Sequence, residues 1–384
     1  MNAVVPTGVE DHIGLAVVRS LGMNNIPTTV VSNDKKALPF YSRYCYKKRI
    51  TEYNEAFLSE LTEYDIIMPN GEDEMLFFAK NAPLYDYTIA YPDISTLETI
   101  IDKSRMMRFA TTHGIPVPET YFINSPGDLH EIHSSLKYPV IIKPNQEKGG
   151  RGIVRVDGPD TLEEMYAYNL HHYGPSIIQE YIPFKKRYSS AALIDKDYEI
   201  QRICIIQENR TYPLHSGPGC FVETVKNREI MDLTVDILEA VDIWGIAELD
   251  FVIDERDGTP KFLEINPRFW GSVQCAISAG VDFPFLLHEI VTDNTISVSY
   301  EYKAGIKSRN VISNDLRHLL AVLRGSSPFT CKLKTVIDFM KFYQDDAYFI
   351  FSLSDMKPFL SLFEYYLLKK ANRVRLNMSE EVSK

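Results

Sequence analysis

Short apolar runs alternate with amphipathic stretches over the first hundred residues. The runs "NAVVPTG", "IPTTVVSN" and "DIIMPNG" predict strands, whereas "GLAVVRSLG", "NEAFLSELTEY" and "EDEMLFFAKN" predict helices. Alternation of this kind predicts parallel strands joined by crossover helices. The turn at Gly8 follows the first strand but lacks the GxGxxG pattern, so we interpret it as a structural turn rather than a dinucleotide site.

The pattern changes at "DKSRMMRFATTHGIPVPET". Asp102 can cap a helix that runs to His113, and the prolines of "IPVPET" require an extended chain after it. The strands predicted beyond this point are "PVIIKP", "IVRV", "SIIQEYI", "SSAALI", "YEIQRICIIQ", "IAELDFVID" and "PKFLEIN". With the intervening helices "TLEEMYAYNLHHY" and "REIMDLTVDILEAVDIW", they predict an α+β unit that is separate from the first domain.

The last part of the chain, from about residue 300, is rich in leucine and aromatic residues with helical spacing. It includes "NDLRHLLAVLRG" and "PFLSLFEYYLLKKANRVR", of which the second ends in a basic cluster. Such a helix could lie on a membrane surface. We favour a helix that packs on the core, because Lys and Arg are common near the C-terminal end of such helices.

The bulk composition is that of a soluble globular protein, with 45% hydrophobic and 24% charged residues in 384. The net charge of −11 argues against nucleic acid as the main partner. Five scattered cysteines without CxxC spacing argue against a disulfide framework and a structural zinc site. The N-terminus has no signal-peptide pattern and no apolar run is long enough to span a membrane, so we expect a cytoplasmic protein.

The loop "KPNQEKGGRG" has features of a phosphate-binding loop. Gly149, Gly150 and Gly152 let backbone N–H groups approach phosphate oxygens, and Lys148 adds positive charge. Lys143 ends the preceding strand, where its ammonium could reach a nucleotide phosphate. The loop is not a Walker A motif, because GxxxxGK[ST] is absent, and taken alone it is also compatible with an ordinary hairpin.

The stretch "IIQEYI" could present backbone groups to an adenine edge after Gln179 and Glu180. In isolation, a strand end with solvent-facing polar groups explains these residues better.

The strongest chemical signal lies in "AELDFVIDERDGTPKFLEINPRFW", where two apolar strands are joined by the turn "DERDG". Asp250 on the first strand and Glu264 on the second can face each other, and Asn266 lies on the same face as Glu264. Two carboxylates and an amide oxygen suit Mg²⁺. Arg268 continues this face and could stabilise a transferring phosphoryl group. A polar network on an exposed sheet face is the alternative, and the buried character of "FLEI" and "LDFVI" fits it badly.

The ordered set of Lys103 in "DKSRM", "GIPVPET", "YPVIIKP", the glycine loop, "QEYI" and "LDF…LEINPR" resembles ATP-grasp enzymes. These include carboxylate–amine and carboxylate–thiol ligases, biotin carboxylase and carbamoyl-phosphate synthetase. The resemblance implies a pre-ATP-grasp α/β domain over residues 1–100 and an ATP-grasp domain over residues 101–295. Within the latter, a lid subdomain spans about 115–182 and a metal-binding subdomain about 183–295. Residues 296–384 then form a C-terminal helical extension.

The resemblance also implies roles for individual residues. The residues assigned to ATP are Lys103, Lys143, Lys148, Gly149, Gly150, Gly152, Gln179, Glu180, Tyr181 and Ile182. Asp250, Glu264 and Asn266 would hold Mg²⁺, with Mn²⁺ as an alternative ion. Arg268 and Lys143 would be the catalytic cations, with Arg268 facing an acyl phosphate. Many relatives have an acidic ribose contact where this chain has Arg187, so the ribose contact stays open.

Substrate residues vary in this family, and "HSGPGCFVET" stands where a substrate loop is expected. His215, Ser216, Gly217, Arg202 and Arg268 are the substrate candidates, although a packed loop explains the glycine and proline content equally well. The implied reaction joins a small carboxylate to an amine with release of ADP and phosphate. Bicarbonate or carbamate phosphorylation and a non-catalytic nucleotide-binding protein are the alternatives. A homodimer is expected from the relatives.

Overall fold

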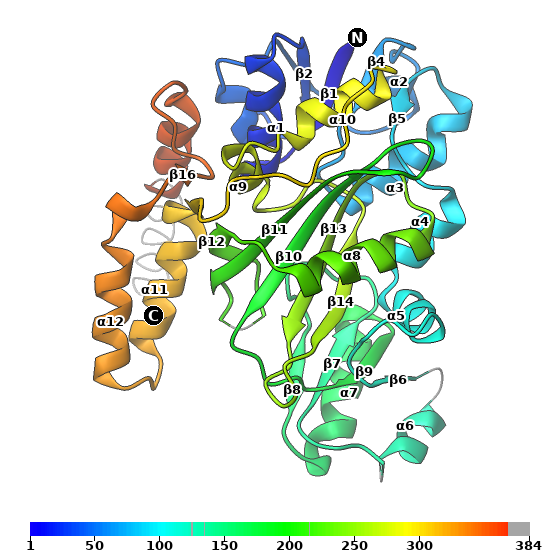
Figure 1. Ribbon diagram of the computed structural model, residues 1–384, viewed down its shortest axis with the longest axis vertical. Coiled ribbons are helices and arrows are strands. Elements are labelled where there is room, and N and C mark those ends of the chain that lie inside the picture. The colour runs from blue at the N-terminus through cyan, green and yellow to red at the C-terminus, as the bar shows by residue number, and fades with distance from the viewer. Residues whose placement is uncertain (124–125, 134, 215, 368–384) are drawn as a thin grey trace, which may run out of the picture.

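The computed structural model describes residues 1–123, 126–133, 135–214 and 216–367. Three β-sheets follow one another along the longest axis of the molecule, with helices on their faces (Figure 1). The predicted fold, a parallel N-terminal sheet followed by an α+β unit and C-terminal helices, is confirmed. Among the described residues, no helix combines the length and the apolar run needed to cross a bilayer.

The N-terminal sheet is entirely parallel and has the strand order β3-β2-β1-β4-β5. Its strands are β1 (Asn2–Pro6), β2 (Thr28–Ser32), β3 (Lys47–Ile50), β4 (Asp65–Ile67) and β5 (Thr88–Ile89). Its helices are α1 (His12–Met23), α2 (Glu55–Leu58), α3 (Glu72–Asn81) and α4 (Ile94–Ile101). After β1 the chain continues to β2 on one side of β1, whereas after β4 it continues to β5 on the other side. The sheet therefore has a switch point between β1 and β4, and ligands bind at such points in open α/β sheets.

The second sheet has four strands in the order β6-β9-β7-β8, which lie within residues 115–182, the range predicted to form a lid. Its strands are β6 (Thr120–Phe122), β7 (Val140–Pro144), β8 (Val154–Val156) and β9 (Ser176–Glu180). Helices α6 (Pro126–Ile132) and α7 (Leu162–Tyr173) pack with these strands around a small core of their own. The glycine loop connects β7 to β8.

The central sheet has the strand order β14-β13-β10-β11-β12-β15-β16. Its long strands are β10 (Arg187–Ile194), β11 (Ile200–Thr211), β12 (Gly219–Thr224), β13 (Gly245–Ile253) and β14 (Pro260–Asn266). Helices α5 (Lys103–Thr112) and α8 (Arg228–Val241) cover one face. As predicted, Asp102 caps α5, accepting a hydrogen bond from the Arg105 amide at 3.0 Å.

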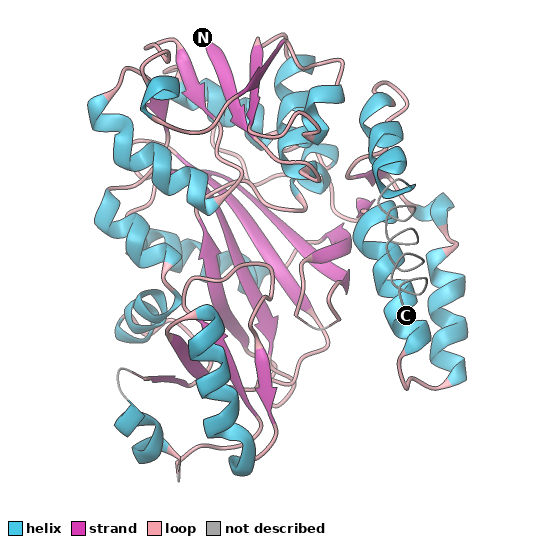
Figure 2. Cartoon of the chain, turned by 180° about the vertical axis from the view of Figure 1, so that it is seen from behind, coloured by secondary structure: helices cyan, strands magenta, loops and turns pink. Residues whose placement is uncertain are grey.

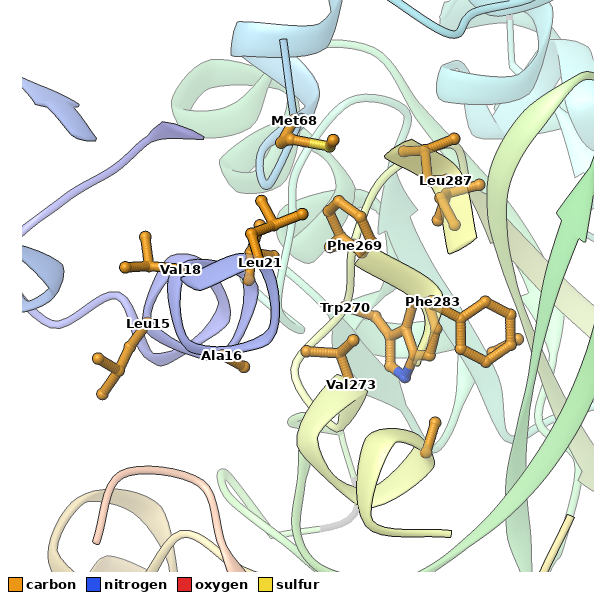
Figure 3. Close-up of a cluster of buried hydrophobic side chains, with 14 of the residues drawn as sticks. Leu15, Ala16, Val18, Leu21, Met68, Phe269, Trp270, Val273, Phe283 and Leu287 are labelled. Atoms are coloured by element: carbon orange, nitrogen blue, oxygen red, sulfur yellow. The ribbon is translucent and has the colours of Figure 1, made fainter. Parts of the chain in front are cut away.

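The other face of the central sheet packs against α9 (Val273–Ser278) and α10 (Phe283–Val291). Leu21 of α1 lies beside Phe269 in Figure 3, and Leu15 and Val18 belong to the same cluster of buried apolar side chains. One continuous apolar core therefore joins the N-terminal domain to the central sheet, and it fixes the two relative to each other.

The C-terminal extension contains the predicted helices and also two short strands that the sequence did not predict. Its strands β15 (Lys307–Arg309) and β16 (Ala347–Tyr348) extend the central sheet beyond β12. They have three and two residues, too few to produce a recognisable alternation. The π-helix η4 (Val311–Asp315), α11 (Leu316–Arg324) and α12 (Phe329–Phe339) lie between them in the chain.

Helices α11 and α12 stand beside the stacked sheets (Figure 1, Figure 2), and neither contains a fully buried residue. The predicted core packing is met by the next helix, residues 357–367, where Leu362 is buried. The basic cluster predicted at the end of that helix lies outside the described residues.

A buried carboxylate ties the C-terminal extension to the N-terminal domain. Asp355 accepts hydrogen bonds from Arg19 Nε at 2.9 Å, Ser42 Oγ at 2.7 Å and the Arg43 amide at 2.9 Å. The charge of the Asp355 carboxylate is therefore compensated by groups from the first domain, and these contacts anchor the C-terminal extension to that domain.

Candidate active site

A cavity of about 750 Å³ lies where the lid, the central sheet and the N-terminal domain meet. Its walls come from the glycine loop, the start of α5, the β13–β14 hairpin, the turns after β1 and β4, and η4. This volume is near the upper end of the range for ligand pockets, about 300–1,000 Å³.

The β13–β14 hairpin supplies the acidic floor of the cavity. Asp250 pairs directly with Glu264, and Glu248 pairs with Asn266. The facing arrangement predicted for Asp250 and Glu264 is therefore observed. Glu248 also lines the cavity, and sequence reasoning missed it although it shares a strand face with Asp250. Burial raises the pKa of Glu248 well above its ordinary value.

Two lysines from different elements converge on Glu264. Lys103 is the first residue of α5 and Lys143 lies near the end of β7, and their Nζ atoms are 3.5 and 3.4 Å from Glu264 Oε2. Burial alone would raise the pKa of Glu264, but Lys143, Lys103 and Arg187 outweigh burial and hold that pKa below its ordinary value. Glu264 is thus held as a carboxylate inside a cationic setting.

Arg187 occupies the centre of this charge cluster. Its three guanidinium nitrogens are directed to Glu208 Oε2 at 3.3 Å, Asp250 Oδ2 at 3.0 Å and the Gly217 carbonyl at 3.1 Å. In the sequence, Arg187 was notable only because many relatives in the resembled family have an acidic residue at this position. In the structure, the Arg187 side chain contacts the predicted metal ligand Asp250, and it links Asp250 to the loop before β12.

Arg268 lies between the hairpin and the N-terminal domain. Its NH2 group is 3.0 Å from Asn266 Oδ1 and 3.1 Å from Glu72 Oε1. Glu72 is the first residue of α3 and is 7% exposed. No local sequence pattern indicates this contact, because nearly two hundred residues separate the two partners.

The predicted metal ligands provide a suitable donor set. The oxygens of Asp250, Glu264 and Asn266 lie on one hairpin and are paired with Arg187, Lys143 and Arg268, respectively. His, Cys, Asp and Glu side chains form no group of three that could hold a metal among the residues described, and the Asn266 amide oxygen is needed to complete the set. Carboxylate and amide oxygens are what Mg²⁺ requires.

The glycine loop closes over the cavity. Lys148 contacts Glu72 at 3.8 Å and Asp73 at 3.0 Å, both on α3. Gly150 has a φ of 78°, and a Cβ at this residue would lie 2.5 Å from the Ser216 carbonyl oxygen. Lys148 thus links the glycine loop to α3, and Gly150 allows the loop to pack closely against Ser216.

Replacing Gly150 with alanine is expected to raise the KM for ATP about tenfold more than replacing Gly149. Both residues have positive φ, 78° and 60°, so both variants incur the same kind of backbone strain. Only the alanine at 150 would collide with Ser216, because nothing lies within 4 Å of a Cβ at Gly149. Steady-state kinetics of phosphate release checks this, and equal KM values in the two variants would contradict it.

The residues predicted to contact adenine also line the cavity. Glu180 accepts a hydrogen bond from the Glu119 amide at 3.0 Å and pairs with Arg256 at 2.9 Å. Gln179 Nε2 donates to Thr120 Oγ1 at 2.9 Å, so it also holds the lid sheet together. Tyr181 and Ile182 belong to the same wall. Contact of this segment with adenine stays a prediction.

The four other substrate candidates have different outcomes. Ser216 lines the cavity, Gly217 accepts the hydrogen bond from Arg187, and His215 lies outside the described residues. Arg202 does not line the cavity, so its prediction as a substrate residue is corrected. It pairs with Leu193, six residues along β11 from the cavity-lining Glu208. Its guanidinium donates to the carbonyls of Gln201 and Ser297.

Comparison with known proteins agrees with this architecture. Residues 100–272 match the family model of the ATP-grasp domain. A carbamoyl phosphate synthase large chain from Mycobacterium sp. (strain JLS) is 23% identical over 320 residues, which cover 74% of this chain and 29% of the relative. Another from Methanobrevibacter smithii is 22% identical over 232 residues, 56% of this chain and 22% of the relative. The chain thus spans less than a third of the length of these curated relatives.

Solved structures share the fold at low sequence identity. The biotin carboxylase domain of the 2-oxoglutarate carboxylase from Hydrogenobacter thermophilus has a TM-score of 0.66 at 18% identity, covering 79% of this chain and 72% of that one. The carboxyaminoimidazole ribonucleotide synthase from Aspergillus clavatus, solved with ATP, has a TM-score of 0.65 at 20% identity, covering 84% and 85%.

Proposed function

Because this chain is an ATP-grasp domain protein, we propose that it is an ATP- and Mg²⁺-dependent ligase that joins a carboxylate to an amine. The observation that carries the proposal is the convergence of Lys103 and Lys143 on Glu264, directly opposite Asp250 and beside Arg268. Catalysis of phosphoryl transfer depends mainly on positioning and on stabilising charge. This arrangement provides both within one cavity.

The proposed reaction has two steps. A substrate carboxylate oxygen attacks the γ-phosphorus of ATP, the bond from that phosphorus to the β-phosphate oxygen breaks, and ADP leaves. An amine then attacks the acyl phosphate, phosphate leaves with the bonding electrons, and the nitrogen loses a proton. Lys103 and Lys143 would bind phosphate oxygens, and Arg268 would stabilise the acyl phosphate.

Mg²⁺ held by Asp250, Glu264 and Asn266 would neutralise charge on the transferred phosphoryl group. Arg187 would keep Asp250 oriented, since its guanidinium is fixed by Glu208 and by the Gly217 carbonyl as well. Lys148 and the glycines after it would cover the phosphates and exclude water from the acyl phosphate.

Phosphorylation of bicarbonate is the second candidate. It is favoured by the relatives, which include carbamoyl phosphate synthases, and by the Hydrogenobacter domain, which was crystallised with MgADP and bicarbonate. That domain is also described as a dimer. A homodimer and a cytoplasmic location stay predictions for this chain.

Phosphate release from ATP and Mg²⁺ tests the proposal. The purified chain is given amino acids, dipeptides, simple carboxylates and bicarbonate, singly and in pairs. Release that requires a carboxylate together with an amine is the expected result. Release with bicarbonate alone would favour the second candidate, and ATP binding without release under any condition would contradict both.

A further inference from the structure

An arginine and two carboxylates share one largely buried corner of the active-site cavity. Arg187 lies on β10, the strand between β11 and β13 in the central sheet. It stands directly opposite Glu208 on β11, and Asp250 lies on the other neighbouring strand, β13. All three side chains line the cavity, and they are 14%, 8% and 7% exposed.

Three oxygen atoms from three separate segments surround the Arg187 guanidinium. Glu208 Oε2 lies 3.3 Å from its Nε, and Asp250 Oδ2 lies 3.0 Å from its Nη2. Its Nη1 donates to the Gly217 carbonyl at 3.1 Å. The backbone at Gly217 is packed so closely that a Cβ there would collide with the Tyr212 carbonyl. Two carboxylate oxygens and one backbone carbonyl are the hard oxygen donors that otherwise bind Mg²⁺.

The two carboxylates require a cation at this position, because a buried charge needs a compensating partner. Among the residues described, Arg187 is the one cation that forms an ion pair with either of them. Burial disfavours a charged guanidinium, but Glu208, Asp250 and Glu264 outweigh burial and raise the pKa of Arg187 above its ordinary value. The guanidinium is therefore held here as a permanent positive charge.

A second metal ion at this corner would compete with the guanidinium. In sites that use two metal ions for displacement at phosphorus, the ions lie about 3.5–4 Å apart. Asp250 pairs directly with Glu264 on the hairpin, so an ion between Asp250 and Glu208 would be the neighbour of an ion on Glu264. The planar guanidinium already fills the space between Asp250 and Glu208, and its fork of N–H donors matches carboxylate geometry.

We propose that the Arg187 guanidinium takes the place of a second metal ion, so that the site holds a single Mg²⁺ on Asp250, Glu264 and Asn266. This assignment rests on the metal ligands of the proposed function and adds Arg187 as a positioning residue. A fixed guanidinium neutralises Glu208 and Asp250 whatever the concentration of free Mg²⁺. One ion bound with the nucleotide then suffices for the site.

The test counts the Mn²⁺ ions bound to the full chain with saturating ADP, by electron paramagnetic resonance. Mn²⁺ is a suitable probe because it is paramagnetic and takes the same oxygen ligands as Mg²⁺. The unmodified chain is expected to bind one ion. Arg187→Ala removes the charge and opens room between the two carboxylates. This variant is expected to bind two ions, with the magnetic coupling that only two adjacent ions produce.

Arg187→Lys is the matched control, because it keeps a cation at this position, and it is expected to bind one ion. The double variant Arg187→Ala, Glu208→Gln should also return to one ion, since the second ion then lacks a carboxylate ligand. Where Arg187→Ala unfolds without metal, recovery of its circular dichroism on adding Mn²⁺ reports the same second ion. An ion that binds only the folded chain stabilises that chain.

Two coupled ions in the unmodified chain would overturn the proposal. A single ion in a folded Arg187→Ala chain, or an Arg187→Ala chain that stays unfolded with Mn²⁺, would also overturn it. Absence of any bound Mn²⁺ in the unmodified chain would overturn both the proposal and the metal ligands on which it rests. Failure of the proposed ligase reaction is a different result, namely no phosphate release with any carboxylate–amine pair.

Discussion

Replacing Glu264 with glutamine is expected to lower the rate of ATP-dependent phosphate release about a thousandfold. The glutamine keeps the size of the side chain but removes the negative charge that Lys103 and Lys143 share. It also removes one of two carboxylates proposed to bind Mg²⁺. ATP binding, measured by calorimetry without turnover, should persist because the phosphate-binding lysines and the glycine loop are unchanged.

Glu255→Gln is the matched control for this variant. Glu255 lies in the turn of the same hairpin and pairs with Lys185 at 2.7 Å on the surface. Its rate should equal that of the unmodified chain. Phosphate release near the unmodified rate in Glu264→Gln, with Tm unchanged, would show that Glu264 is not part of the catalytic machinery.

Replacing Asp315 with asparagine is expected to lower the free energy of unfolding by about 3–5 kcal/mol. Asp315 is fully buried, and its carboxylate is the shared partner of Arg210 and Arg309. The neutral amide leaves both guanidinium groups under-compensated in the interior. Urea unfolding followed by tryptophan fluorescence and by circular dichroism measures the loss.

The control for Asp315→Asn is Asp338→Asn. Asp338 pairs with Lys341 at 2.7 Å, but both side chains are more than a third exposed, and such a pair contributes only about 0.2–1 kcal/mol. Similar urea midpoints for the two variants would mean that the buried network does not stabilise the C-terminal extension.

The sequence was informative where chemistry and periodicity coincide locally. The β13–β14 hairpin was predicted together with the pairing of Asp250 and Glu264, because two apolar strands joined by a short turn leave little choice of register. The cap at Asp102 was predicted for the same reason, since a capping residue acts within three positions of its own place in the chain.

Contacts between distant segments were not predictable. Arg187 with Glu208, and Arg268 with Glu72, depend on how strands and domains are arranged, and no local pattern reports that arrangement. The apolar spacing of the segment that forms α11 predicted a helix, yet Leu316, Leu320 and Leu323 on that helix are 39%, 38% and 37% exposed. Helical periodicity identifies an apolar face but not what that face packs against.

The anchoring of Asp355 on the first domain has a consequence for synthesis. A chain leaves the ribosome from its N-terminus, and domains generally fold as they emerge. Here β15, β16 and the Asp355 contacts all come from the last quarter of the chain. Arg19 and Ser42 therefore lack their partner Asp355 until residue 355 has been synthesised, and the cavity lacks part of its wall until residues 310–314 have been synthesised. A nascent chain that stalls after residue 272, where the match to the ATP-grasp domain ends, would expose the edge of β12 and the basic side chain of Arg19 to chaperones.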